Sequence, residues 1–243
     1  MSGNGSVRGF PDPAPRLELP PAAELDPLID RLAPLTAMVA EAPTSLSSVV
    51  DPSEAEDVHL RDSLSALGLD VVRRARSVVD IGSGAGYPGI PLAMALPAAK
   101  FTLLDSVGKK ARFAGQAASR LGLENVEAIA GRSEELAATG GREAFDLALA
   151  RAVAPLSVLA ELASPLLTEG GTLVAWKGAR EREEEAEVER LAGRLAMEPD
   201  AVFSVIPFEG SRSRHLYLLS KSGPTPEGLP RRPGMARKRP LPD

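Results

Sequence analysis

The sequence predicts an α/β fold: a mostly parallel seven-stranded sheet, closed by an antiparallel hairpin at its C-terminal end. Between residues 77 and 197, short apolar runs typical of strands alternate with longer runs of helical periodicity. Such alternation indicates a parallel sheet with helices on both faces. Two further strand-like runs, 202–208 and 215–221, are joined by a loop too short for a helical crossover, so they should pair antiparallel.

The chain before the sheet is predicted to form a tail and a small helical region. Residues 1–21 contain five prolines together with glycine and serine and show no hydrophobic periodicity, which predicts a disordered tail. Residues 22–76 are predicted to form an N-terminal helical region. One helix is expected over 22–40, where leucines recur at helical spacing, and another from Asp51, which can cap it with Pro52 in the first turn.

The sheet domain is predicted to span residues 77–222. Its parallel part follows from apolar runs of strand length that are separated by helical patterns. We expect strands at 78–81, 100–104, 125–130, 145–150, 172–177, 202–208 and 215–221, and helices at 90–96, 107–121, around Ser133, at 155–167 and at 179–197. The carboxyl ends of the parallel strands should meet at one edge, where such sheets bind their ligands.

Residues 223–243 are predicted to form a basic C-terminal arm. Proline and glycine recur too often after Pro230 for a helix or strand to form. Phosphate contact explains a cluster of cations in such a segment better than packing does, although a merely solubilising tail is the alternative. The residues expected to bind nucleic acid are Arg231, Arg232, Arg237, Lys238 and Arg239.

The composition excludes several kinds of site. The 243 residues include no cysteine, which rules out disulfides, zinc–thiolate centres and thiol nucleophiles, and we expect no metal. No apolar run is long enough for a membrane helix, and the N-terminus lacks the apolar core of a signal peptide, so a cytoplasmic protein without membrane contact is expected. The net charge of −5 argues against a protein that coats nucleic acid nonspecifically. We expect a monomer.

The glycine-rich loop after the first predicted strand admits two ligand classes. Residues 84–89 fit the dinucleotide spacing Gly-x-Gly-x-x-Gly, with an acid at Asp105 about 20 residues on. Residues 80–86 instead fit Asp-x-Gly-x-Gly-x-Gly, the signature of Rossmann-like class I methyltransferases that bind S-adenosylmethionine. A carboxylate at Asp80 suits a ligand with an ammonium group and would repel a pyrophosphate, which favours the methyltransferase. The predicted cofactor contacts in the loop are Asp80, Gly82, Gly84 and Gly86.

Polar residues follow four other predicted strands. Asp105 closes the second strand, where a carboxylate can accept hydrogen bonds from both ribose hydroxyls or, alternatively, cap the next helix. Ser133 and Glu134 follow the third strand and can contact adenine or, equally, form a cap. Arg151 and Lys177 follow the fourth and fifth strands. These two cations are candidates for orienting a polyanionic substrate or the cofactor carboxylate, or they are surface cations.

Several segments together carry a resemblance to a known family. They are residues 79–92, 101–113, 123–126, 150–152, 176–178 and 214–216 and the Pro-Arg-Arg-Pro-Gly motif of 230–234. These segments are similar to the bacterial ribosomal small-subunit RNA methyltransferase G family, also called glucose-inhibited division protein B. The resemblance spans about Asp51 to Leu241. The chain departs from the family pattern at Ser45-Leu46-Ser47, where the family has Asn-Leu-Thr, and in the residues 58–61 before the Asp62-Ser63 pair, where the family has Arg-His.

The resemblance implies a methyltransferase domain at 77–222 that transfers a methyl group from S-adenosylmethionine to N7 of one guanine in 16S rRNA, alone or in the small ribosomal subunit. It implies cofactor contacts at Gly82, Tyr87, Ser133, Glu134 and Arg151. Guanine N7 has a free lone pair and no proton, so the reaction needs orientation rather than a general base. The alternatives are a methyltransferase acting on another RNA, a protein or a small molecule, an NAD-dependent oxidoreductase, and a module that binds the cofactor without catalysis.

Overall fold

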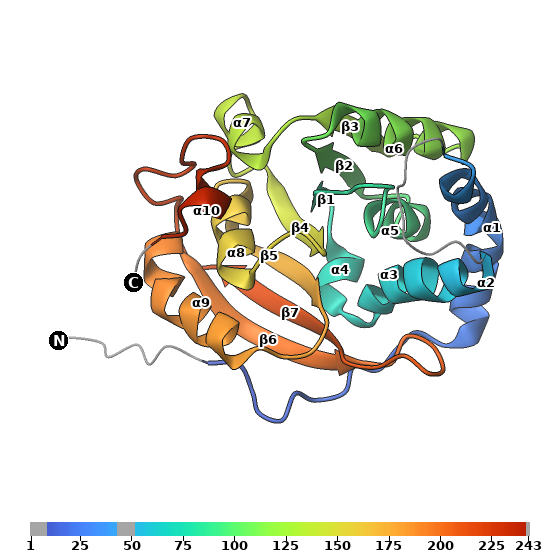
Figure 1. Ribbon diagram of the computed structural model, residues 1–243, viewed down its shortest axis with the longest axis horizontal. Helices are drawn as coiled ribbons and strands as arrows, with labels where there is room; N and C mark the ends of the chain where they lie inside the picture. The colour runs from blue at the N-terminus through green and yellow to red at the C-terminus, as the bar shows by residue number, and fades with distance from the viewer. Residues whose placement is uncertain (1–8, 43–51, 242–243) are drawn as a thin grey trace.

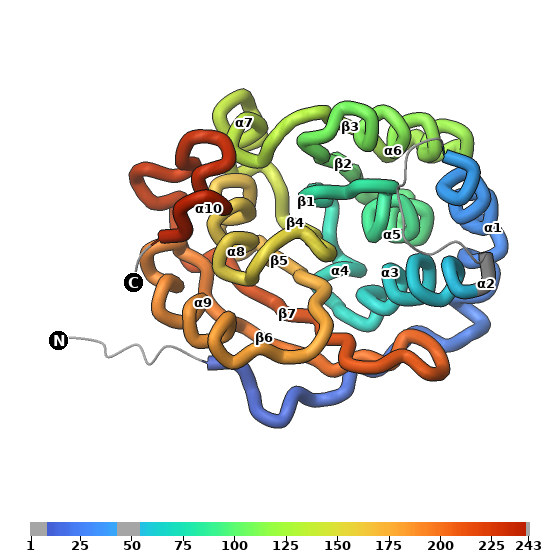
Figure 2. Tube along the Cα trace, viewed as in Figure 1, coloured from blue at the N-terminus to red at the C-terminus, as the bar shows by residue number. Residues whose placement is uncertain are grey.

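A computed structural model describes residues 9–42 and 52–241 (Figures 1 and 2). It contains a seven-stranded sheet in the order β3-β2-β1-β4-β5-β7-β6. The strands β1 to β5 pair in parallel, whereas β7 runs antiparallel to both β5 and β6. Their bounds are β1 Ser77–Ile81, β2 Lys100–Asp105, β3 Val126–Ala130, β4 Phe145–Arg151, β5 Leu167–Lys177, β6 Met197–Val205 and β7 Arg214–Lys221. The predicted fold is confirmed.

Helices cover both faces of the sheet. Alternating residues of β1 show this: Val78 packs into one apolar core with α5 and α6, while Val79 and Ile81 pack into the other with α8 and α9. The helix bounds are α5 Gly89–Ala95, α6 Gly108–Arg120, α7 Ser133–Ala138, α8 Leu156–Ala163 and α9 Arg182–Leu195.

Four predicted boundaries in the C-terminal half are wrong. The helix expected over 179–197 ends at Leu195, because Ala196 adopts a left-handed conformation with φ of +50° and turns the chain into β6. The strand expected over 202–208 therefore begins earlier, at Met197, and ends at Val205. Strand β5 likewise begins at Leu167, before the predicted start at 172.

The N-terminal helical region lies beside α5 (Figure 1) and packs into the apolar core that contains Val78, α5 and α6. Helix α1 spans Ala22–Ala40 and buries one side made of Leu25, Ile29, Leu32, Leu35 and Val39. The second predicted helix is present but broken into short segments: α2 Pro52–Ala55, the π-helix η1 Glu56–Arg61, α3 Asp62–Leu64, the 3₁₀-helix η2 Ser65–Gly68 and α4 Asp70–Arg74. The expected cap at Asp51 lies outside the described residues.

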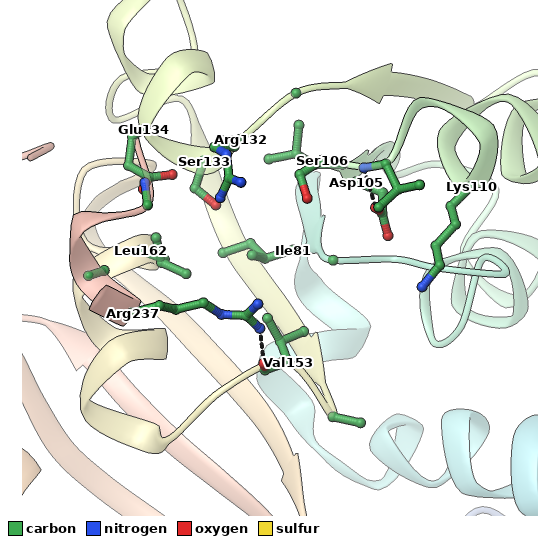
Figure 3. A pocket seen from close by; sticks show the side chains of 17 residues that line it. Ile81, Asp105, Ser106, Lys110, Arg132, Ser133, Glu134, Val153, Leu162 and Arg237 are labelled. Carbon is green, nitrogen blue, oxygen red and sulfur yellow. Dashed lines mark hydrogen bonds between the residues drawn. The ribbon is translucent and has the colours of Figure 1, made fainter. Parts of the chain in front are cut away.

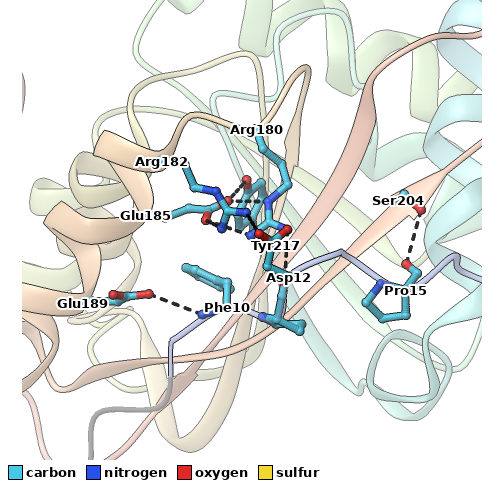
Figure 4. A network of polar contacts seen from close by, with 10 residues as sticks. Phe10, Asp12, Pro15, Arg180, Arg182, Glu185, Glu189, Ser204 and Tyr217 are labelled. Carbon is cyan, nitrogen blue, oxygen red and sulfur yellow. Dashed lines mark hydrogen bonds and ion pairs between the residues drawn. The ribbon is translucent and has the colours of Figure 1, made fainter.

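The prediction of a disordered tail over 1–21 is wrong for residues 9–21, while residues 1–8 lie outside the described part. Figure 4 shows this segment against α9 and the β6–β7 hairpin. Phe10 is buried with its ring edge-on to Tyr217, at 5.0 Å between centroids. The Leu17 N–H donates to the Ser204 carbonyl of β6, and the Ser204 N–H donates to Pro15. Buried apolar contacts and backbone pairing thus order a proline-rich segment.

The C-terminal arm was expected to form neither helix nor strand, and this is also wrong. Residues Met235–Lys238 form one helical turn, α10, which packs on α8 through Ala236. Gly234 precedes it with φ of +81°, a conformation that glycine adopts without strain. None of the helices in the described ranges is long and apolar enough to cross a membrane.

Candidate functional site

The glycine-rich loop links β1 to α5 at the carboxyl edge of the sheet. At two of its glycines, a side chain could be added only by displacing a neighbouring side chain. A Cβ at Gly86 would lie 2.3 Å from Cδ1 of Ile90, and Gly86 has φ of +95°. A Cβ at Gly89 would lie 2.7 Å from Oδ2 of Asp80. The loop is therefore folded tightly against the end of β1.

Asp80 is buried at the end of β1 and holds this loop. Its Oδ2 accepts a hydrogen bond from the Gly89 N–H at 2.9 Å. Its Oδ1 is buried without a hydrogen-bond partner. Burial raises the pKa of the Asp80 carboxyl to about 7, although the Gly89 N–H and the charge of Arg151 act in the opposite direction.

Asp105 joins the loop to the end of β2. Its carboxylate accepts hydrogen bonds from the Gly84 N–H at 2.9 Å and from the Val107 N–H at 2.8 Å. Helix α6 begins at Gly108 with Val107 as its N-cap residue and no side-chain cap, so Asp105 holds the turn before the helix and does not cap it. Each carboxylate oxygen retains a lone pair for a further donor.

A cavity of about 240 Å³ lies in front of Asp105 (Figure 3). We call it the first cavity. It is formed where the ends of β1, β2, β3 and β4 meet, and the predicted contacts Gly82, Asp105, Ser133 and Glu134 all line it. Figure 3 shows Asp105 and Lys110 on one side and Glu134, Leu162 and Arg237 on the other.

A second cavity of about 400 Å³ adjoins the first, and Ala152 lines both. Its other lining residues include His59 and Asp62 from the N-terminal region, Arg151 and Trp176 from β4 and β5, and Lys177 and Arg214. The two predicted orienting cations thus lie together here. Lys177 forms an ion pair with Glu184 of α9, with 2.7 Å between Nζ and Oε2.

Arg151 is the centre of a largely buried cluster at the second cavity. Its Nη1 lies 3.2 Å from Oδ2 of Asp62, and its guanidinium carbon lies 5.3 Å from the centre of the Tyr87 ring. Tyr87 in turn stacks on His59, with 4.8 Å between ring centroids. Burial and the charge of Arg151 lower the pKa of His59 to about 4, so this imidazole is neutral at physiological pH.

Three of the orphaned buried polar atoms belong to the loop. Among the described residues, the buried side-chain atoms without a hydrogen-bond partner include Oδ1 of Asp80, Oγ of Ser83 and the hydroxyl of Tyr87. Leaving such atoms unpaired costs free energy, so their concentration within eight residues indicates a place built for a polar ligand.

Comparison with known proteins identifies the family. The model of the rRNA small subunit methyltransferase G family matches residues 31–216, well over half of the chain. The chain belongs to the rRNA small subunit methyltransferase G family. The curated "Ribosomal RNA small subunit methyltransferase G" of Pelotomaculum thermopropionicum is 40% identical over 202 residues, which cover 81% of this chain and 83% of that protein. The protein of the same name from Rubrobacter xylanophilus is 42% identical over 202 residues, covering 80% and 77%.

Solved structures of methyltransferases share the fold. The mitomycin 7-O-methyltransferase has a TM-score of 0.58 at 13% identity, covering 82% of this chain and 67% of that one. An O-methyltransferase of Thermotoga maritima has a TM-score of 0.54 at 16% identity, covering 79% and 73%. At this low identity the likeness concerns the fold alone, and it agrees with the sheet order of a class I methyltransferase.

In this member of the methyltransferase G family, the five cations of the arm lie differently from the prediction that all contact phosphates. Arg231 is turned inward and pairs with Glu161 of α8 through Nε at 2.7 Å and Nη2 at 2.6 Å. Arg237 donates to the Val153 carbonyl at the first cavity. The side chains of Arg232, Arg237, Lys238 and Arg239 are exposed, and phosphate contact stays a prediction for all five cations.

Sequence reasoning missed Asp62 and Arg214 as site residues. Asp62 is buried beside Arg151, and Nε of Arg214 lies 3.7 Å from its Oδ1. Asp62 directly follows the residues at which the chain departs from the family pattern, and that departure was the available signal. His59 also lines the second cavity, where its imidazole stacks on the Tyr87 ring.

The buried carboxyl of Asp80 predicts a pH dependence of stability. The Asp80 carboxyl has a pKa of about 7 in the folded chain and near 3.8 in the unfolded chain. Between these two pH values, the folded chain therefore binds more protons than the unfolded chain. The free energy of unfolding is therefore expected to fall as the pH rises through this window and to level off above it. Asp80→Asn keeps an oxygen for the Gly89 N–H and is expected to remove this part of the slope. Urea unfolding of both proteins over the window measures it, and parallel curves would contradict the assignment.

Proposed function

We propose that this chain transfers the methyl group of S-adenosylmethionine to N7 of a guanine in 16S rRNA of the small ribosomal subunit. The observation that carries the proposal is the pair of adjoining cavities at the carboxyl edge of the sheet, in a member of the rRNA small subunit methyltransferase G family. One cavity suits a nucleoside with an amino-acid tail, and the other can receive a base beside it. We further propose that the protein acts as a monomer in the cytoplasm, where its RNA is found.

The residues of the first cavity and the loop fit the cofactor. Asp105 accepts from the ribose hydroxyls, while Ser133 and Glu134 contact the adenine. Oδ1 of Asp80 and the hydroxyl of Tyr87, which lack partners, contact the ammonium and carboxylate end together with Gly82, Gly84 and Gly86. Arg151 contributes its positive charge to the cofactor carboxylate from the far side of the Tyr87 ring.

The second cavity fits a base with its phosphates. Arg151, Lys177 and Arg214 offer hydrogen-bond donors to acceptor atoms of guanine and to phosphate oxygens. Asp62 offers an acceptor, and guanine N1–H and its exocyclic amine are donors on the opposite edge of the base. Because the deep, narrow major groove of an A-form helix hides guanine N7, the target guanine enters from a loop or after leaving its stack.

The main task of the protein in this reaction is to orient the base so that N7 faces the methyl group. S-adenosylmethionine supplies the methyl group, whose bond to sulfur breaks as the bond to N7 forms. No side chain needs to remove a proton from N7, which agrees with the absence of a nucleophile–histidine–carboxylate arrangement among the residues that line the described cavities. Holding the two reactants in line supplies a catalytic advantage of about 7–11 kcal/mol in favourable cases.

The proposal predicts one labelled guanine. The purified protein is incubated with methyl-labelled S-adenosylmethionine and either naked 16S rRNA or intact small subunits, and label is mapped by N7-specific strand cleavage. We expect label at one guanine, with the better substrate showing which assembly state is recognised. Label on a protein, on a small molecule or at another ring atom would replace the proposed acceptor while leaving the methyltransferase assignment in place.

A further inference from the structure

The C-terminal arm folds back over the first cavity. Figure 1 shows α10 beside α8 and below α7, close to the ends of the strands that form the site. The Gly234 N–H donates to Oε1 of Glu134 at 2.7 Å, across 100 residues of sequence. Ala236 is only 1% exposed and packs against Val158 and Leu162 of α8. The arm is thus docked by specific contacts.

Three residues of the arm line the cavity itself. They are Gly234, Ala236 and Arg237, which face the ends of β1 and β2 across the space. In Figure 3, the Arg237 side chain runs along the cavity from the arm to the Val153 carbonyl, below Ile81. Without the arm, this side of the cavity would be bounded by α7 and α8 alone.

We propose that the docked arm is a working part of the cofactor site. It forms the outer wall of the first cavity, and S-adenosylmethionine binds tightly only while the arm stays docked. The proposal rests on the proposed function, because it takes the first cavity as the place of the adenosine. It assigns a cofactor role to Arg231 and Arg237, two cations that the sequence predicts to contact RNA.

The ion pair between Arg231 and Glu161, which we call the clasp, holds the arm in its docked position. Both carboxylate oxygens are engaged, and the side chains are only 20% and 5% exposed. A two-point pair of this kind fixes orientation as well as distance, and at low exposure it is little screened by salt. Arg231 also donates to the Arg239 carbonyl at 2.8 Å, which closes the arm into a loop around the clasp.

The adenosine end of the cavity explains why docking would matter to the ligand. Glu134 was expected to contact adenine, and one of its oxygens already holds the Gly234 N–H. The arm therefore fixes the orientation of a carboxylate that faces the ligand. A wall that is already in place also spares the ligand the entropy cost of ordering it.

The test measures cofactor binding without RNA. Calorimetry with S-adenosylmethionine and with S-adenosylhomocysteine compares the full chain with Arg231→Gln and with a chain that ends at Pro230. We expect cofactor binding to be weaker by about five- to tenfold in both, because the wall of the cavity is then loose or missing when the ligand binds. The shorter chain keeps Leu229, whose carbonyl accepts from Arg142, so the body of the domain retains that contact.

Matched controls remove the same charge from the outer face of the arm. Arg232→Gln and Lys238→Gln alter exposed cations that do not line the first cavity. We expect both to bind the cofactor like the unmodified chain, while losing affinity for RNA and part of its salt dependence. Thermal melts of every variant report whether the fold is intact.

A second readout tests the same linkage in reverse. If the cofactor needs the docked arm, it must stabilise docking, so it should slow tryptic cleavage after Arg237 and Lys238 in the full chain by a factor similar to the loss of affinity. The inference would be overturned if Arg231→Gln and the chain that ends at Pro230 both fold and bind the cofactor at least as tightly as the full chain, or if the cofactor leaves the rate of cleavage unchanged. Either result would leave the proposed function in place. If the full chain bound no cofactor at all, the proposed function would fall together with it.

Discussion

Replacing Arg151 with methionine is expected to lower the free energy of unfolding by about 3–5 kcal/mol at neutral to alkaline pH. Arg151 forms the ion pair with Asp62 whose side chains are 15% and 7% exposed, so the substitution leaves a buried carboxylate that has lost its hydrogen-bonded cation and keeps, among the described cations, only Arg214, with Nε at 3.7 Å from Oδ1. It also removes the hydrogen bond to the Val58 carbonyl. Urea unfolding followed by circular dichroism measures the change.

The pH dependence of this variant identifies the cause. Burial raises the pKa of Asp62 even with Arg151 present, and the charge of Arg151 is the largest influence in the opposite direction. Without Arg151 the pKa rises further, so the cost is full above the new pKa and shrinks as the pH falls through it. Adding Asp62→Asn should recover part of the stability. A loss that is independent of pH and unrelieved by Asp62→Asn would show that packing, rather than the ion pair, is responsible.

Asp105→Ala is expected to weaken S-adenosylmethionine binding at least about tenfold, in line with losing one or more charge-assisted hydrogen bonds. The side chain both lines the first cavity and holds the glycine loop through the Gly84 N–H. Calorimetry measures the affinity. Asp105→Asn keeps one acceptor oxygen, so its affinity should lie between those of the unmodified chain and Asp105→Ala.

The chain contains a matched control for this prediction. Asp146 also accepts two backbone N–H groups, those of Arg76 and Ser77, but at the opposite edge of the sheet. Asp146→Ala should lower stability and leave cofactor affinity unchanged. Equal losses of affinity in the two alanine variants would mean that Asp105 acts on the fold and that the ribose assignment is wrong.

The sheet and the glycine loop were predictable because their causes are local. Strand and helix periodicity repeats over a few residues, and the glycines at 82, 84 and 86 mark positive φ angles along a short stretch. Strand ends then bring Asp105, Ser133 and Glu134 to one cavity by topology alone. Boundaries were less predictable, since the turn at Ala196 uses a residue with no special preference for it.

The rest of the site depends on contacts between distant segments. Asp62 and Arg151 are 89 residues apart, and nothing local in either segment indicates the other. The docking of the arm likewise depends on Glu161, 70 residues before Arg231. A cluster of cations predicts affinity for phosphate on average, but in the folded chain one of these cations, Arg231, pairs with the buried carboxylate of Glu161. The same holds at the N-terminus, where Phe10 and Leu17 turn a proline-rich stretch into packed structure.

The segment around residues 15–17 also bears on how the protein behaves in concentrated solution. Strand β6 is the last strand of the sheet, and an exposed edge strand is a template on which a second molecule can add its own strand. The hydrogen bonds of Ser204 to Pro15 and Leu17 occupy the C-terminal end of that edge, and the pairing of β6 with β7 is irregular nearer its start, between Pro199 and Ala201. The N-terminal segment therefore covers part of this edge and protects it from pairing with a second molecule. A chain that lacks the segment would lose that protection while keeping every residue of the two cavities.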